Sequence, residues 1–356
     1  MSDYFDTGFC VRQASWHGKE TLLQEHPENW ADARRLAGLE WEPAYAPIYV
    51  ERLIPAEQEV PAGAVLIGRA DLSDGTFARR YHVPQGDHKA IVRDDTWATL
   101  AVPSESYELI YHRQMGELLE AYLESWQKAG ARVRYETAGS VEGGKRVWAL
   151  VVLDEPWHAP GDPSATYPYA AITNAHDGSA ACRVTPLNVR IVCANTWRMA
   201  DLEAGAHGHG VVIRHTASAA DRIEEAKATL AGMRDEAKQW QMTAEELARI
   251  NVTDAMYRTF LDEFIPVPEG ASDRTRGQRD ERRKVFTALY EGTTAASALT
   301  MEGITGNGYG LVQAAGEYLD HLRPYRTPDT YLARTLLRPE SIKGGVVKLV
   351  RELATA

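Results

Sequence analysis

His176 and Asp177 are the residues whose types and spacing most directly suggest chemistry. An adjacent His and Asp pair can bind a metal ion that activates water, and Cys193 could act as a nucleophile with His176 as its base. The alternatives are structural. The run Asn174-Ala-His-Asp-Gly is rich in turn-forming residues, and Cys193 falls on an apolar stripe where cysteines are usually inert. We favour the structural alternatives, and we expect no cofactor and no metal site.

A second set of residues could hold a polyanion. Arginine and lysine contact phosphates, and aromatic rings stack on bases, which is how single strands are held without sequence readout. The candidate phosphate contacts are Lys145, Arg146, Arg183, Arg190 and Arg198. Trp148, Trp197, Tyr167 and Tyr169 lie near them in the sequence, and a further basic run extends from Arg274 to Lys284. In the opposing interpretation, the rings belong to the core and the arginines pair with surplus acidic residues.

Composition limits the class of protein. The 356 residues are 44% hydrophobic and 25% charged, as in an ordinary globular protein. The net charge of −11 argues against a protein that is basic overall, but residues 271–356 carry 13 Lys/Arg against 10 Asp/Glu. This asymmetry is compatible with a local nucleic-acid surface on an acidic body. Three widely spaced cysteines, no long apolar run and no signal-like N-terminus predict a cytoplasmic protein without disulfides or membrane spans.

The elements that would position these residues follow from periodicity. Apolar residues at helical spacing from Met115 to Trp126 predict a helix that ends near Gly130. Gly143-Gly144 predicts a hairpin between two strands, and TYPYAAIT and SAACRV predict a second hairpin. Thr185 followed by Pro186 predicts the start of a helix that extends to Ala200.

The regions on either side carry weaker signals. Short strands are predicted at 65–70 and 80–83, on either side of a turn at Ser73, within an otherwise irregular region 1–100. Beyond residue 215 the chain is predicted to be helical, with a capping box at Thr243 opening one helix and a flexible loop at 266–280. We therefore expect an α+β protein with three regions, 1–100, 101–215 and 216–356. Its central antiparallel sheet of hairpins would be flanked by helices, and its C-terminal region would be helical.

Several sequence blocks closely resemble a family of uncharacterised phage/plasmid-like proteins. These blocks are TWATLAVPSESYELI, YETAGSVEGGKRVWALVVL, TNAHDGSAACRVTPLNVRIVCANTW, IRHT and GEYLDH. The resemblance covers nearly the whole chain and implies a mobile genetic element as source and the cytoplasm of a host bacterium as setting. It implies no activity. The predicted order of helix, hairpins and helix is also similar to the core of phage annealing proteins of the RecT/Erf type.

These observations support three hypotheses. The first is a phage-encoded protein that binds or anneals single-stranded DNA during recombination or replication, forms a homo-oligomer and catalyses no covalent chemistry. The second is a metal- or Cys-dependent hydrolase that uses His176, Asp177 and Cys193. The third is a non-enzymatic oligomer that binds other proteins, such as an inhibitor of a host defence enzyme. We favour the first.

Overall fold

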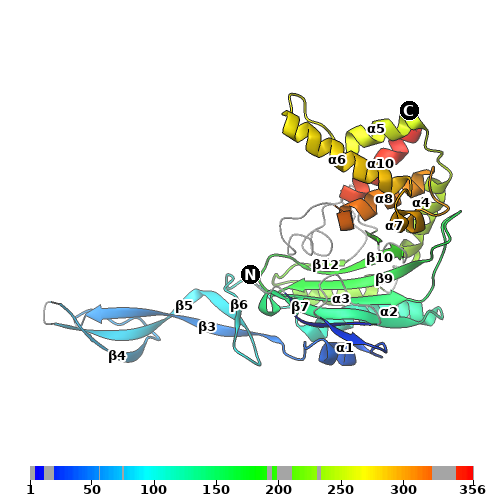
Figure 1. Cartoon of the computed structure of the whole chain (residues 1–356). Helices are drawn as coiled ribbons and strands as arrows, with labels where there is room; N and C mark the ends of the chain where they lie inside the picture. Colours follow the sequence, from blue (N-terminus) through cyan, green and yellow to red (C-terminus); the bar gives the residue numbers. More distant parts are fainter. Residues whose placement is uncertain are drawn as a thin grey trace.

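The computed structural model describes residues 5–11, 20–55, 57–73, 76–190, 195–198, 211–230, 234–322 and 342–355. Figure 1 shows three parts: a large sheet with helices on it, a long β-arm, and a group of helices that ends the chain. Both sheets and helices are present and the large sheet is mixed, so the protein is α+β.

The large sheet has the order β11-β10-β9-β8-β7-β1-β2, and β12 also pairs with β10. Only the pairing of β1 with β2 is parallel among the pairings between described strands. The predicted hairpins β7–β8 and β9–β10 are both confirmed. The strand bounds are β1 Phe5–Val11, β2 Thr21–Leu23, β7 Val133–Val141, β8 Arg146–Leu153, β9 Thr166–Ala175, β10 Cys182–Arg190, β11 Asn195–Arg198 and β12 Val211–Ile213.

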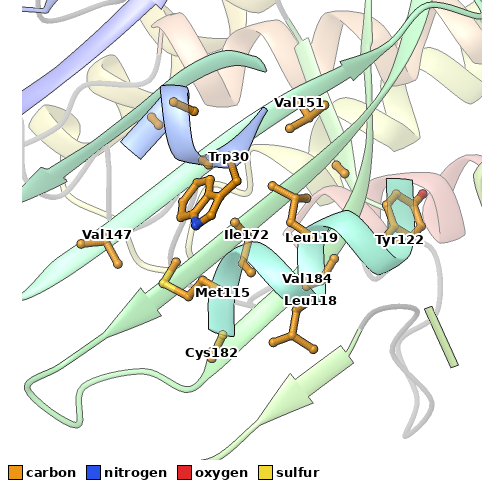
Figure 2. Packing of buried hydrophobic residues seen from close by; sticks show 14 of the residues in the cluster. Trp30, Met115, Leu118, Leu119, Tyr122, Val147, Val151, Ile172, Cys182 and Val184 are labelled. Carbon is orange, nitrogen blue, oxygen red and sulfur yellow. The ribbon is translucent and has the colours of Figure 1, made fainter. Parts of the chain in front are cut away.

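One face of this sheet is covered by α2 (His112–Lys128) and α3 (Ala219–Leu230). The predicted helix at 115–126 is confirmed as α2, and Gly130 follows its end with a left-handed φ of 91°. Figure 2 shows the α2 side chains packed among those of the strands. The α2 residues Met115, Leu118, Leu119, Tyr122 and Trp126 are each 2% exposed or less. This burial, worth about 1.5–3 kcal/mol for each large apolar side chain, fixes the helix to the sheet. We call this cluster of buried side chains between the helices and the sheet the sheet core.

The predicted helix at 185–200 is wrong. Residues Cys182–Arg190 form β10 and residues Asn195–Arg198 form β11. On one side of β10, β12 pairs with residues 182–184 and β11 pairs with residues 187–190. Pro186 lies in the gap between these pairings, so its missing N–H interrupts no ladder on that side.

The arm is a sheet of order β3-β5-β4, with β6 (Thr99–Ala101) pairing with β5 near the body. It consists of β3 (Pro43–Pro55), β4 (Val65–Asp71) and β5 (Phe77–Arg93). The hairpin predicted around Ser73 is confirmed by the pairing of β4 with β5. The short strand predicted at 65–70 is confirmed as β4, whereas the one predicted at 80–83 is part of the 17-residue strand β5. The expectation of an otherwise irregular region is wrong for β3, which has 13 residues. β3 pairs with β5 across a long separation in sequence, which local patterns do not reveal.

Every element after β12 is a helix in the described part of the chain. The bounds after α3 are α4 Arg234–Ala248, α5 Asp254–Phe264, α6 Asp273–Tyr290, α7 Ala295–Thr300, α8 Gly308–Glu317, a π-helical turn Tyr318–Leu322 and α10 Ile342–Thr355. These helices pack around a second apolar core, separate from the sheet core. Two local predictions are wrong here. Thr243 lies inside α4 instead of opening a helix, and most of the loop predicted at 266–280 belongs to α6.

A short helix, α1 (Trp30–Leu36), lies below the sheet and connects β2 to the arm. Trp30 packs against α2 at Gly116, where an added Cβ would overlap the indole ring. The indole Nε1 of Trp30 also donates to the carbonyl of His112 at 3.0 Å. The root of the arm is thereby attached to the first turn of α2.

Candidate nucleic-acid interface

The face of the large sheet opposite α2 carries several of the predicted site residues. Residues paired directly across neighbouring strands share one face of a sheet. One such row runs Gly139, Trp148, Thr173, Arg183 and Val212 across β7, β8, β9, β10 and β12. We call this side of the sheet the outer face.

A second row on the outer face runs Arg134, Val152 and Tyr169 across β7, β8 and β9. Val152 and Tyr169 are buried, at 3% and 8% exposed, and Trp148 in the first row is 8% exposed. The middle of this face is therefore an apolar floor. Arg134 retains 30% of its side-chain exposure at the margin and pairs with Asp154 at 3.4 Å.

Arg183 is the predicted site residue with the most suggestive surroundings. It is half-buried on β10, whereas Arg214, just beyond β12, is exposed. Burial lowers the pKa of Arg183, and the nearby positive charge of Arg214 lowers it further. Neither guanidinium has a carboxylate ion-pair partner among the described residues. Two like charges without a counter-charge are unfavourable, and a bound anion would relieve that repulsion.

Lys145 and Arg146 lie at the β7–β8 hairpin, as predicted, and are half-buried. Arg146 forms an ion pair with Glu142 at 3.4 Å, and its Nε donates to the Ser179 hydroxyl at 3.2 Å. The Lys145 carbonyl accepts the backbone N–H of His176 at 2.7 Å. Arg146 pairs with Ala175, which lies two residues along β9 from Thr173, the partner of Arg183. Both arginines therefore lie on the outer face in adjacent rows, about 12 Å apart.

Arg190 does not belong to this surface. It is 1% exposed. Alternate residues of a strand face the same side, and Cys182 and Val184 of β10 lie in the sheet core, so Arg190 lies on the α2 side of the sheet. Its Nε and Nη2 donate to the two carboxylate oxygens of Asp162 at 2.7 and 2.8 Å, and its Nη1 donates to the Thr300 carbonyl at 2.6 Å. The guanidinium thus joins the sheet to the end of α7. A phosphate contact by Arg190 does not fit this burial.

Two predicted residues fall outside what the structure describes. Cys193 lies outside the described residues, and only the backbone of Arg198 is described. Arg198 lies on β11, the edge strand of the sheet, and its backbone pairs with Leu187 of β10.

The His176-Asp177 pair serves a structural purpose. Asp177 accepts the backbone N–H of Ser179 at 2.9 Å, which closes the predicted turn. His176 is fully buried, and its Nε2 lies 3.0 Å from Nε2 of His112. No group of three or more His, Cys, Asp or Glu suited to a metal occurs among the described residues.

The histidine pair has a defined arrangement of protons. Nδ1 of His112 lies 3.2 Å from the Leu39 carbonyl, which can only accept, so this nitrogen carries the hydrogen. Nε2 of His112 then accepts from Nε2–H of His176, and the buried Nδ1 of His176 is left without a partner. Burial lowers the pKa of His112 to about 4 and holds the pKa of His176 well below its usual range. Both imidazoles are therefore neutral at pH 7.

A third histidine, His215, lies beside this pair and was not singled out as part of it from the sequence. Its Nδ1 lies 2.9 Å from the Glu108 carbonyl oxygen, its Nε2 lies 3.0 Å from Asn174 Oδ1, and its ring stacks on Tyr107. Burial lowers the pKa of His215. The three histidines come from distant parts of the chain and follow no periodic pattern, so only the fold brings them together.

Four positive charges without ion-pair partners in the described part of the chain lie together on α6. Arg274 and Arg276 are exposed and Arg279 and Arg282 are half-buried, and none of the four forms an ion pair with a described residue. Arg283, by contrast, pairs with Asp262 at 2.9 Å. The buried residues of α6 are Phe286, Leu289 and Tyr290 in its last turns, so its first half extends free of the helical core (Figure 1). The sequence shows this basic run, but its first part was predicted to be a loop and lies on a helix instead.

Comparison with known protein families identifies the chain. The family described as domain of unknown function DUF932 matches residues 99–338. The chain belongs to this family. The DUF932 match begins at β6 and includes the large sheet from β7 onward, the Arg183–Arg214 pair and α6. The arm lies before the matched residues. No curated protein and no solved structure matches the chain significantly.

No helix in the described ranges is both long enough and apolar enough to cross a membrane.

Proposed function

We propose that this DUF932 protein binds single-stranded DNA, with the first half of α6 as its main phosphate-binding surface and the Arg183–Arg214 edge of the sheet as a second contact. The observation that carries the proposal is the group of four α6 guanidiniums without ion-pair partners among the described residues. Other described arginines, such as Arg52, Arg79 and Arg132, also lack an ion pair with a described residue, but only on α6 do four such residues lie together on one projecting helix. Guanidiniums grouped in this way without carboxylate partners favour an external polyanion.

The choice of a single strand rests on additional observations. On the outer face Trp148 and Tyr169 are buried, whereas Tyr167 is only half-buried. A partly accessible ring near cationic side chains can stack a splayed base, and Tyr167 is the candidate for that contact. The resemblance to phage/plasmid-like proteins makes a role in recombination or replication of a mobile element our preferred setting. The similarity to RecT/Erf-type annealing proteins is limited to α2 and the hairpins, because the helix expected at 185–200 is replaced by strands.

The test is a salt titration of binding to a fluorescein-labelled oligo(dT), followed by anisotropy. For single strands the slope of log Kobs against log salt is about −0.7 for each phosphate neutralised. The double variant Arg274→Gln/Arg276→Gln should therefore weaken binding and reduce the slope by about 1.4. Labelled duplex of equal length, run in parallel, should bind less tightly.

The matched control is Lys128→Gln/Lys348→Gln. Both lysines are exposed helical residues paired with glutamates four positions away, and this variant changes net charge equally. It should bind like the wild type. Equal weakening by both variants would mean that net charge alone governs binding, and no binding at low salt would refute the proposal.

The hydrogen bond of Asp177 within the turn and the pairing of His176 with His112 argue against the hydrolase hypothesis. The protein-interaction hypothesis gains support from the arm.

A further inference from the structure

More large apolar side chains of the arm are exposed to solvent than are buried in its own core. Figure 1 shows it extending away from both the large sheet and the helices. Its buried cluster consists of three residues, Ile54, Tyr81 and Val83, with Val60 and Ala64 packed against them. A three-stranded ribbon with so small a core is marginally stable by itself. Its large exposed hydrophobic residues are Tyr45, Tyr49, Val50, Leu53, Val65, Leu66, Ile67, Leu72 and Phe77.

The two faces of the arm differ. Strand pairing places Ile54, Tyr81 and Val83 on one face, where Val60 and Ala64 cover them. The same pairing places Leu53 beside Arg80, Glu51 beside His82 and Val65, and Tyr49 beside Pro84 on the other. We call this second side the open face. Tyr49, Leu53 and Val65 on it are 46%, 49% and 55% exposed.

The open face is nearly neutral. Gly68 lies in the row of Leu53 and Arg80, and a Cβ there would meet nothing within 4 Å. Arg80 forms an ion pair with Glu51 at 3.2 Å, and the ring of Tyr49 lies 6.1 Å from that of His82. Apolar side chains thus surround the Arg80–Glu51 ion pair, whose two charges cancel. Such a surface can pack on an identical copy of itself without bringing like charges into direct opposition.

Charge distribution favours a second copy at the arm over one at the body. Residues 43–93 contain six acidic and six basic residues, so the whole net charge of −11 belongs to the rest of the chain. Two bodies of this charge repel each other. Arms that project away from the bodies can meet while the bodies remain apart.

We propose that the arm is a dimerisation element, whose open face packs against the open face of a second copy to form a small β-sandwich. Three strands about 4.8 Å apart and eight residues long give a planar face of roughly 370 Å², or about 750 Å² for the two copies. Stable interfaces bury about 1,200–2,000 Å². The dimer therefore dissociates on dilution, and it tightens as salt screens the repulsion between the bodies.

The test is sedimentation velocity of the full chain over a concentration series at low and high salt. The wild type should shift from monomer to dimer with concentration, with the midpoint at lower concentration in high salt. Leu53→Glu/Val65→Glu should remain monomeric throughout. Its control is Val50→Glu/Leu66→Glu, which places the same charges on the same two strands at exposed positions of the covered face.

The control variant should dimerise like the wild type, and circular dichroism should show that both variants fold. A wild type that stays monomeric at every concentration would overturn the proposal, as would equal loss of dimer in the two variants. The dimer tightens with salt while DNA binding weakens, so failure of one proposal is distinguishable from failure of the other.

Discussion

The buried His112–His176 pair predicts that the protein loses stability in mild acid. The perturbation is a fall in pH from 7 to 5. His112 has a folded-state pKa of about 4 against an ordinary value of 6.5, because burial penalises its charged form and the charges of Arg34 and Arg93 oppose it further. As pH falls, the unfolded chain binds a proton before the folded chain does. The stabilising contribution is therefore complete above about pH 6.5 and is lost progressively toward pH 4.

The magnitude follows from the two pKa values of His112. Between pH 7 and pH 5 the difference in proton binding removes about 2 kcal/mol from the free energy of unfolding. His176 contributes in the same direction, since its pKa is also well below its usual range. Both residues connect the first turn of α2 to the β9–β10 turn, so their protonation should weaken the root of the arm and the sheet together.

The assay is urea denaturation at pH 7 and pH 5, followed by tryptophan fluorescence at a concentration where the wild type is monomeric. Wild type should lose at least about 2 kcal/mol between the two pH values. His112→Gln should be less stable at pH 7 but should lose about 2 kcal/mol less on acidification. His82→Gln, at an exposed histidine of the arm, should match the wild type. Equal acid sensitivity in wild type and His112→Gln would refute the reasoning.

Three further predictions concern stability. Arg190→Met should lower the free energy of unfolding by about 3–5 kcal/mol in urea denaturation, because it leaves the buried Asp162 carboxylate without its guanidinium, and Arg190→Met/Asp162→Leu should recover much of that loss. Gly116→Ala should lower the melting temperature, because overlap with Trp30 costs about 1–3 kcal/mol and outweighs a helix-propensity gain of about 1 kcal/mol. Asp177→Ala should cost about 1 kcal/mol in urea denaturation, through loss of its turn hydrogen bond to Ser179; a larger loss would show that Asp177 has a structural part beyond the turn.

Local signals were sufficient for part of the fold. The α2 stripe and the two hairpins were predictable because helical spacing and turn residues act over a few positions. The region 185–200 was not, since its β-branched residues also fit a helical stripe and only pairing with β9, β11 and β12 decides for strands. In the arm, the β4–β5 hairpin was predictable, but the pairing of β3 with β5 was not, because it joins residues far apart in sequence.

The sequence predicted a basic surface on the sheet, but it did not predict which arginines belong to that surface. Arg183 and Arg146 do share one face of the sheet, because they fall in neighbouring rows of paired strands. Arg190 is buried against Asp162, a partner that no spacing rule could indicate. The α6 arginines were visible as a basic run, but few apolar residues mark this helix, and it was predicted to begin as a loop.

The most direct test of DNA binding is the change in salt slope caused by Arg274→Gln/Arg276→Gln on labelled oligo(dT). We expect the slope to be about 1.4 shallower in this variant than in the wild type, and to be unchanged in Lys128→Gln/Lys348→Gln. An unchanged slope in the α6 variant, at unchanged affinity, would contradict the assignment of α6 as the phosphate-binding surface.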